Sequence, residues 1–174
     1  MTNTQQVEPT VRGSLHLLEA GRGAIRMEEV YDTDIEDLWS AITDPDRLGR
    51  WFAIVEGDLR VGGMIFARFI STDEGPGRID VCEAPHRLKV TMKPGASDEA
   101  EIVVVLTSEG EKTRLAIEDR RLTRENLSDY GAGWQVHLED LASFLAEREQ
   151  GDWQARWRQL RPVYARLSME PLGE

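Results

Sequence analysis

The segment that decides the fold spans Asp34–Trp51 and reads DIEDLWSAITDPDRLGRW. Its apolar residues recur at the three- and four-residue spacing of one helix face, and Thr33 or Asp34 is placed to cap that helix. Asp44-Pro45 then stops the helix, and Asp44 can cap a second short helix that continues to residue 51. The segment therefore predicts two short helices in succession.

A strand is predicted directly before these helices. Residues 24–31 alternate between apolar and polar side chains, and a shorter run, 14–18, is placed to pair with them. Residues 1–11 are expected to form a loosely attached arm. Two helices immediately after a first strand are an unusual order for an antiparallel β protein.

A series of short strands is predicted after the helices. Glycine- and proline-containing turns separate six runs with strand character, at residues 54–59, 64–70, 78–83, 87–92, 101–107 and 113–119. Because the connections are short, an antiparallel meander is expected.

The last part of the chain is predicted to be helical. Trp134, Leu138, Leu141 and Leu145 form an apolar stripe that must lie on the sheet. Asp152 can cap a further helix, which Pro162 is expected to kink or divide.

Composition places the chain among soluble globular proteins. The 174 residues fit a single domain, 1–174, and the net charge of −11 argues against a nucleic-acid partner. No apolar run is long enough for membrane insertion, and neither a signal peptide nor a disulfide framework is evident with Cys82 as the one cysteine. A cytoplasmic protein is expected.

Several motifs in this order resemble the START-like (SRPBCC) superfamily, and within it the group named after the activator of Hsp90 ATPase homologue 1. The motifs are Leu38–Pro45 followed by Leu48 and Trp51, Gly62-Gly63, Gly77-Arg78-Ile79, Pro85-His86-Arg87-Leu88, and Gly133-Trp134 at the start of the last family helix. The resemblance implies an α+β helix-grip fold for residues 22–148, in which a curved antiparallel sheet grips the long helix. Residues 150–174 form a helical extension beyond it.

The resemblance also implies a hydrophobic cavity between sheet and helix, which in this superfamily holds lipids, polyketides, hormones or other apolar molecules. A bent sheet cannot contact a straight helix along its whole length, which independently favours such a space. The candidate ligand-binding residues are Trp39, Trp51, Phe52, Phe66, Phe69, Val81, Met92, Val104, Trp134, His137, Leu138 and Leu141. The alternative is that these side chains simply fill the core.

Three polar residues are candidates for chemistry in such a cavity. His137 flanks the apolar stripe, Tyr130 precedes the Gly131-Ala132-Gly133 stretch, and Arg68 lies within a predicted strand. If its face points inward, Arg68 needs a carboxylate partner such as Asp80 or Glu118, or an anionic ligand; otherwise it lies outside. No metal-binding spacing or phosphate loop is present, so neither metal nor cofactor is expected.

The extension differs in charge from the rest of the chain. Residues 153–169 contain four arginines and no acid, whereas residues 28–37 contain six acids and no base. Trp153, Trp157 and Tyr164 either close over the body of the protein or form an interface with a second copy or another protein.

The expected function is binding of a small hydrophobic or amphipathic molecule, without catalysis. Two alternatives remain at this stage. One is a cyclase- or hydrolase-type enzyme that uses polar groups in the same cavity, and the other is a protein-interaction module, either chaperone-associated or homodimeric.

Overall fold

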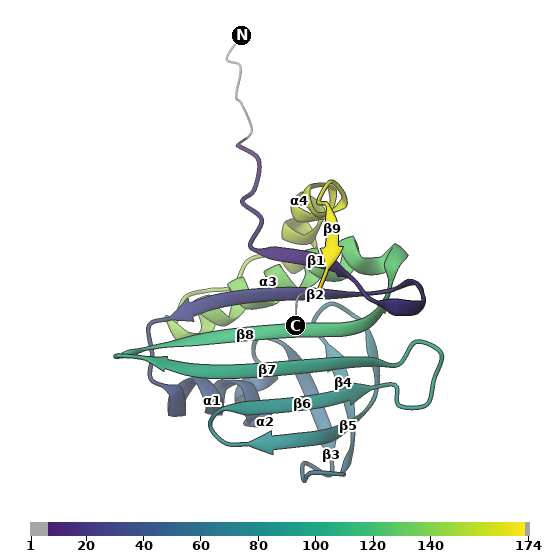
Figure 1. The fold of residues 1–174 in the computed structure, drawn as a ribbon. Coiled ribbons are helices and arrows are strands. Elements are labelled where there is room, and N and C mark those ends of the chain that lie inside the picture. Colours follow the sequence, from purple (N-terminus) through teal and green to yellow (C-terminus); the bar gives the residue numbers. More distant parts are fainter. Residues whose placement is uncertain (1–6, 173–174) are drawn as a thin grey trace.

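A single curved sheet of nine strands forms the frame of the molecule (Figure 1). This computed structural model describes residues 7–172. The strand order is β3-β4-β5-β6-β7-β8-β2-β1-β9. The strands are β1 (Gly13–Leu17), β2 (Arg22–Tyr31), β3 (Ala53–Gly57), β4 (Met64–Phe69), β5 (Glu74–Glu83), β6 (Arg87–Met92), β7 (Ala100–Glu109), β8 (Lys112–Thr123) and β9 (Met169–Pro171).

Neighbouring strands are antiparallel except at one edge, where β9 pairs in parallel with β1. The curved antiparallel sheet expected from the sequence is confirmed, and the short parallel strand β9 at its edge was not foreseen. The sheet is mixed because the chain returns after its last helix and adds three residues beside the first strand. Such a short segment carries no periodicity that could have identified it in the sequence.

The two short helices follow β2 as predicted. Helix α1 (Ile35–Thr43) is capped by Asp34, whose side chain accepts a hydrogen bond from the Asp37 backbone. Helix α2 (Pro45–Leu48) is capped by Asp44 and ends earlier than expected, because the chain turns at Gly49. Beyond that turn, the Trp51 indole packs back and donates to the Ala41 carbonyl.

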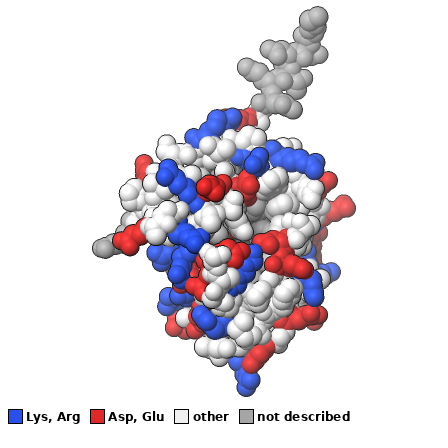
Figure 2. Space-filling model, turned by 90° about the vertical axis from the view of Figure 1, so that its right-hand side faces the viewer, with Lys and Arg blue, Asp and Glu red and all other residues white. Residues whose placement is uncertain are grey.

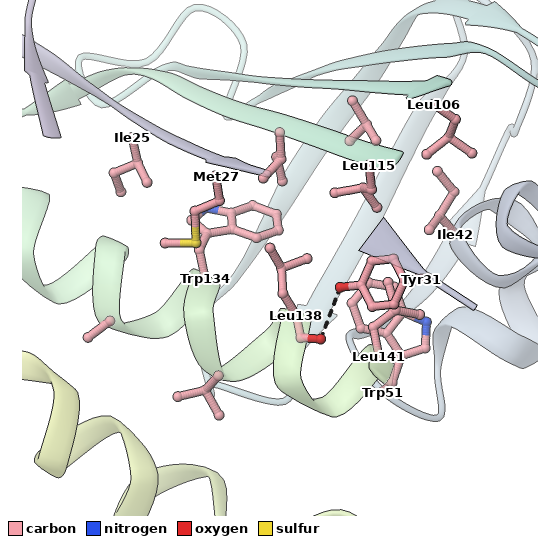
Figure 3. Packing of buried hydrophobic residues seen from close by; sticks show 14 of the residues in the cluster. Ile25, Met27, Tyr31, Ile42, Trp51, Leu106, Leu115, Trp134, Leu138 and Leu141 are labelled. Carbon is pink, nitrogen blue, oxygen red and sulfur yellow. Dashed lines mark hydrogen bonds between the residues drawn. The ribbon is translucent and has the colours of Figure 1, made fainter. Parts of the chain in front are cut away.

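The long helix α3 (Leu127–Leu145) lies across the concave face of the sheet. Its apolar stripe points toward the strands in Figure 3, where the Tyr31 hydroxyl also donates to the Leu138 carbonyl at 3.0 Å. The helix begins six residues before Gly133, which was expected to open it. A short 3-10 turn, η2 (Arg124–Asn126), leads into it, and another, η1 (Glu19–Gly21), joins β1 to β2.

The sequence of α3 contains three consecutive small residues, Gly131, Ala132 and Gly133, where a second helix packs against it. Residues 131–138 are all buried, since the sheet covers one face and α4 (Trp153–Ala165) covers the other. Helix α4 is a single helix with Pro162 inside it, so the expected division did not occur. Proline there removes one hydrogen bond, to the carbonyl of the exposed Arg158, which water can reach.

The C-terminal extension packs on its own body. Tyr164 is completely buried, accepts a hydrogen bond from the Gly13 backbone and donates one to Gln135. Arg156 pairs with Glu139 on α3, and Arg161 pairs with Asp129. These pairs bring basic extension and acidic body together, and Figure 2 shows one face on which the two signs of charge are interspersed.

The two glycines of α3 predict opposite effects of adding a methyl group. A Cβ at Gly131 would lie 2.6 Å from the Tyr164 ring, which is buried and hydrogen-bonded and cannot move aside. We expect Gly131→Ala to lower the free energy of unfolding by about 1–3 kcal/mol, the usual effect of overpacking. The measurement is urea unfolding followed by far-UV circular dichroism.

Gly133→Ala is the matched control. Its nearest neighbour would be the Trp153 ring at 3.5 Å, an ordinary contact. Because alanine favours helix over glycine, this variant should be as stable as the wild type or up to about 1 kcal/mol more stable. Equal effects of the two substitutions would contradict the close packing of α4 on Gly131.

Candidate functional site

A cavity of about 540 Å³ lies where α3 and α4 meet the inner face of the sheet. Its volume is in the range of sites that enclose small organic ligands. The β4–β5 and β6–β7 connections complete its rim. The lining residues are Phe52, Phe69, Ser71, Thr72, Asp73, Glu74, Met92, Lys93, Asp98, Ala100, Ile102, Asp119, Leu122, Asp129, Tyr130, Gly133, Trp134, His137, Trp153, Gln154, Trp157 and Arg158.

Aromatic rings form a continuous series along this cavity. The Phe52 ring stacks on Trp134 with centroids 5.2 Å apart and contacts the edge of His137 at 4.8 Å. His137 in turn lies 5.3 Å from Trp153, which stacks on Trp157 at 6.4 Å. The series thus runs from the segment before β3, across α3, to α4. Such flat faces favour an apolar or aromatic ligand.

Asp119 is a carboxyl group in the cavity wall with almost no access to water. It is 4% exposed, and its Oδ2 accepts a hydrogen bond of 2.7 Å from the Trp134 indole. Its other oxygen, Oδ1, is buried without a hydrogen-bond partner among the described residues. Burial raises the pKa of Asp119 to about 7, against the opposing effect of the Trp134 hydrogen bond.

Two further polar atoms in the cavity wall are buried and unsatisfied within residues 7–172. They are Nδ1 of His137 and Nε1 of Trp153. Burial lowers the pKa of His137 to about 3, which the Trp51 backbone opposes only in part, so the imidazole is neutral at physiological pH. Buried polar groups are nearly always hydrogen-bonded, so three unsatisfied ones around one cavity indicate a place for a polar ligand group.

Charged side chains surround the rim of the cavity. Lys93 pairs with Asp98 at 3.0 Å and lies 4.0 Å from Asp73, whose carboxylate accepts a long hydrogen bond from the Tyr130 hydroxyl. Burial raises the pKa of Tyr130, so this hydroxyl remains protonated. The cavity therefore combines an apolar interior with a polar rim.

Six of the predicted residues line this cavity: Phe52, Phe69, Met92, Tyr130, Trp134 and His137. A second, smaller cavity of about 150 Å³ lies deeper, between α3 and the sheet, and shares Phe52, Phe69, Met92, Ile102 and Trp134 with the first. Trp51, Val104 and Leu138 line only this deeper cavity. Trp39 and Leu141 belong to the hydrophobic core and line neither.

Three further predicted residues, Phe66, Arg68 and Val81, also line neither cavity. On β4 the inward side chains are Ile65, Ala67 and Phe69, which places Phe66 and Arg68 on the outer face. Arg68 lies over the Phe66 ring there and pairs with Glu56 and Glu74 rather than Asp80 or Glu118.

Val81 also lines neither cavity. The register of β5 against β6 shifts between Ile79 and Val81, so the alternation of side chains is interrupted there. Cys82, not Val81, therefore lines the deeper cavity.

The sequence reasoning overlooked Asp119 and did not connect Trp153 and Trp157 with the cavity. A signal for Asp119 exists, because strict alternation along β8 places it on the same face as Leu115 and Ile117. In the described part of the chain no cluster of ligating side chains could hold a metal ion, and no helix is long and apolar enough to cross a membrane.

Comparisons with known proteins agree with this architecture. The sequence model described as Activator of Hsp90 ATPase homolog 1-like protein matches residues 32–146. The crystal structure of CalU16 from Micromonospora echinospora is 28% identical, with a TM-score of 0.73, and covers 89% of this chain and 94% of its own. A Bordetella parapertussis protein is 25% identical, with a TM-score of 0.69, and covers 98% of this chain and 97% of its own.

A third solved structure is DynU16, a protein in the dynemicin biosynthetic locus. It is 25% identical, with a TM-score of 0.65, and covers 71% of this chain and 47% of its own. Among curated proteins none matches the chain. The helix-grip fold expected from the sequence is confirmed by these likenesses.

The buried carboxyl of Asp119 predicts a pH dependence of stability. Its pKa is raised in the folded state, so the folded protein binds a proton that the unfolded chain releases between about pH 4 and about pH 7. As pH rises from about 4 to about 7, the free energy of unfolding of the wild type should fall relative to that of Asp119→Asn, by on the order of 2–4 kcal/mol in total. The measurement is the free energy of unfolding of both proteins from about pH 4 to about pH 8.

Asp98→Asn serves as a control of opposite sign. Its ion pair with Lys93 lowers the pKa of the Asp98 carboxyl, so this variant should lose stability relative to the wild type as pH rises from the acid end. A difference between Asp119→Asn and the wild type that does not change with pH would contradict the burial of an unpaired carboxyl.

Proposed function

The chain belongs to the activator of Hsp90 ATPase homologue 1-like family of the SRPBCC superfamily, and we propose that it binds a small amphipathic molecule in the cavity between sheet, α3 and α4. The observation that carries this proposal is the cavity of about 540 Å³ beside the hydrophobic core, together with the adjoining cavity of about 150 Å³. Protein interiors pack to the density of organic crystals, so a space of this size is not ordinary core packing.

The lining supplies both kinds of interaction that such a ligand needs. The aromatic series from Phe52 to Trp157 offers apolar surface, whose burial contributes roughly 25 cal/mol per Å². Asp119, His137 and Trp153 offer a few buried polar atoms, which fix the orientation of a bound molecule. The apolar part of the ligand lies along the rings, and a polar group reaches these atoms.

The access route in this proposal passes the rim formed by α4 and the two loops. Trp153 and Trp157 come from α4, so part of the wall belongs to the C-terminal extension. The deeper cavity adjoins the outer one, because the two share Phe52, Phe69, Met92, Ile102 and Trp134 as lining residues.

A neutral aromatic probe, N-phenyl-naphthylamine, tests this proposal. Its fluorescence should rise on binding and saturate at one probe per chain. Ala100→Phe places a ring in the cavity, and we expect it to weaken binding by at least about tenfold, because the probe and the new side chain compete for the same volume.

Val105→Phe is the matched control on the same strand. Val105 is 39% exposed and lines neither cavity, so its replacement should change probe affinity by less than about threefold. Probe binding that is absent in the wild type, or equally strong in Ala100→Phe, would refute a ligand site in this cavity.

A further inference from the structure

We propose that the ligand carries a protonated amine on an apolar body, and that this ammonium group pairs with Oδ1 of Asp119. The inference rests on the proposed function, because it names the chemical class of molecule that the same cavity would select. Three features support it: a carboxyl group without a cation partner among the described residues, aromatic faces around it and the net negative charge of the chain.

The first feature is the missing cation partner of Asp119. No lysine or arginine among the described residues lies within ion-pair distance of this carboxyl. Its neighbours on β8, Glu118 and Arg120, point to the other face of the sheet and pair with each other there. A buried carboxylate needs a charged or hydrogen-bonded partner on each oxygen. Trp134 provides one partner, and Oδ1, which is buried, has none among the described residues.

The state of this carboxyl agrees with a cationic partner. Burial raises the pKa of Asp119 to about 7, so a large share of the free protein holds it uncharged at neutral pH. A nearby ammonium lowers that pKa again and turns the contact into a charge-assisted hydrogen bond, which is about twice as strong as a neutral one.

The second feature is the aromatic surface around the carboxyl. Trp134 contacts Asp119 directly, and the rings of Phe52 and Trp153 line the same space. The faces of such rings attract cations, tryptophan most strongly, and the attraction increases where water is excluded. A neutral alcohol would gain the hydrogen bond to Asp119 but not the attraction between a cation and the aromatic rings.

The third feature is the negative charge of the chain as a whole. The acids at the rim are themselves paired, Asp98 with Lys93, Asp129 with Arg161 and Glu74 with Arg68. The chain nevertheless carries a net charge of −11. Such an excess of acids favours the approach of a cation over that of an anion.

Three probes with the same apolar cage test the inference: adamantylmethylamine, adamantylmethanol and adamantane carboxylate. They differ in charge and hardly in size, and they do not fluoresce, so the change in tryptophan emission of the full chain, checked by titration calorimetry, reports binding. We expect the amine to bind at least about tenfold more tightly than the alcohol, and the carboxylate to bind more weakly than both.

Asp119→Asn should remove the preference of the protein for the amine. The amide keeps the shape of the side chain and can still accept from Trp134, so alcohol binding should change by less than about threefold while amine binding falls by about tenfold or more. Glu118→Gln is the matched control, because it removes one charge from the outer face of the same strand. It should leave all three affinities unchanged.

Equal affinity of wild type for amine and alcohol would overturn the inference even if Asp119→Asn failed to fold. The same holds if the amine preference survives in Asp119→Asn, or if only N-phenyl-naphthylamine binds. In these cases the proposed site remains. Failure of every probe, including N-phenyl-naphthylamine, would refute the site itself, so the two proposals fail in distinguishable ways.

Discussion

The packing of one straight helix into a strongly curved sheet determines the rest of this structure. Helix α3 contacts the sheet through Trp134, Leu138 and Leu141, and two hydrogen bonds, from Trp134 to Asp119 and from Tyr31 to the Leu138 carbonyl, fix its depth. Where the sheet curves away, side chains cannot reach across. The two cavities lie in these places, and α4 covers the outer one because Gly131 lets the Tyr164 ring pack against α3.

The polar atoms in the outer cavity work against folding. Burial shifts the pKa values of Asp119 and His137 in the direction that favours the neutral form, and each side chain leaves one atom without a hydrogen bond among residues 7–172. A domain selected for stability alone would carry apolar side chains at such positions. Local departures from good packing and full hydrogen bonding concentrate at functional sites, where a ligand supplies the missing partners.

Local signals in the sequence were sufficient for most of the fold. Asp34 and Asp44 cap the helices that they were expected to cap, and the alternating runs became strands. The site was predicted less completely, because it depends on which face of each strand is inward. One irregularity in β5 keeps Val81 out of both cavity walls. On β4 the inward face carries Ile65, Ala67 and Phe69, so Phe66 lies on the outer face. Asp119 escaped notice because a charged residue in a strand normally faces water.

The family model matches the sheet and α3 but not α4, which supplies part of the cavity lining. The match to the family ends at residue 146, directly after α3, whereas Trp153, Trp157 and Arg158 contribute to the outer cavity from α4. The sheet and α3 therefore correspond to the family model, whereas the likeness to the Bordetella parapertussis structure covers 98% of the chain, so the extension is not peculiar to this protein. Because fold and ligand chemistry are separable, the proposed recognition of an amine rests on Asp119 and its aromatic surroundings rather than on family membership.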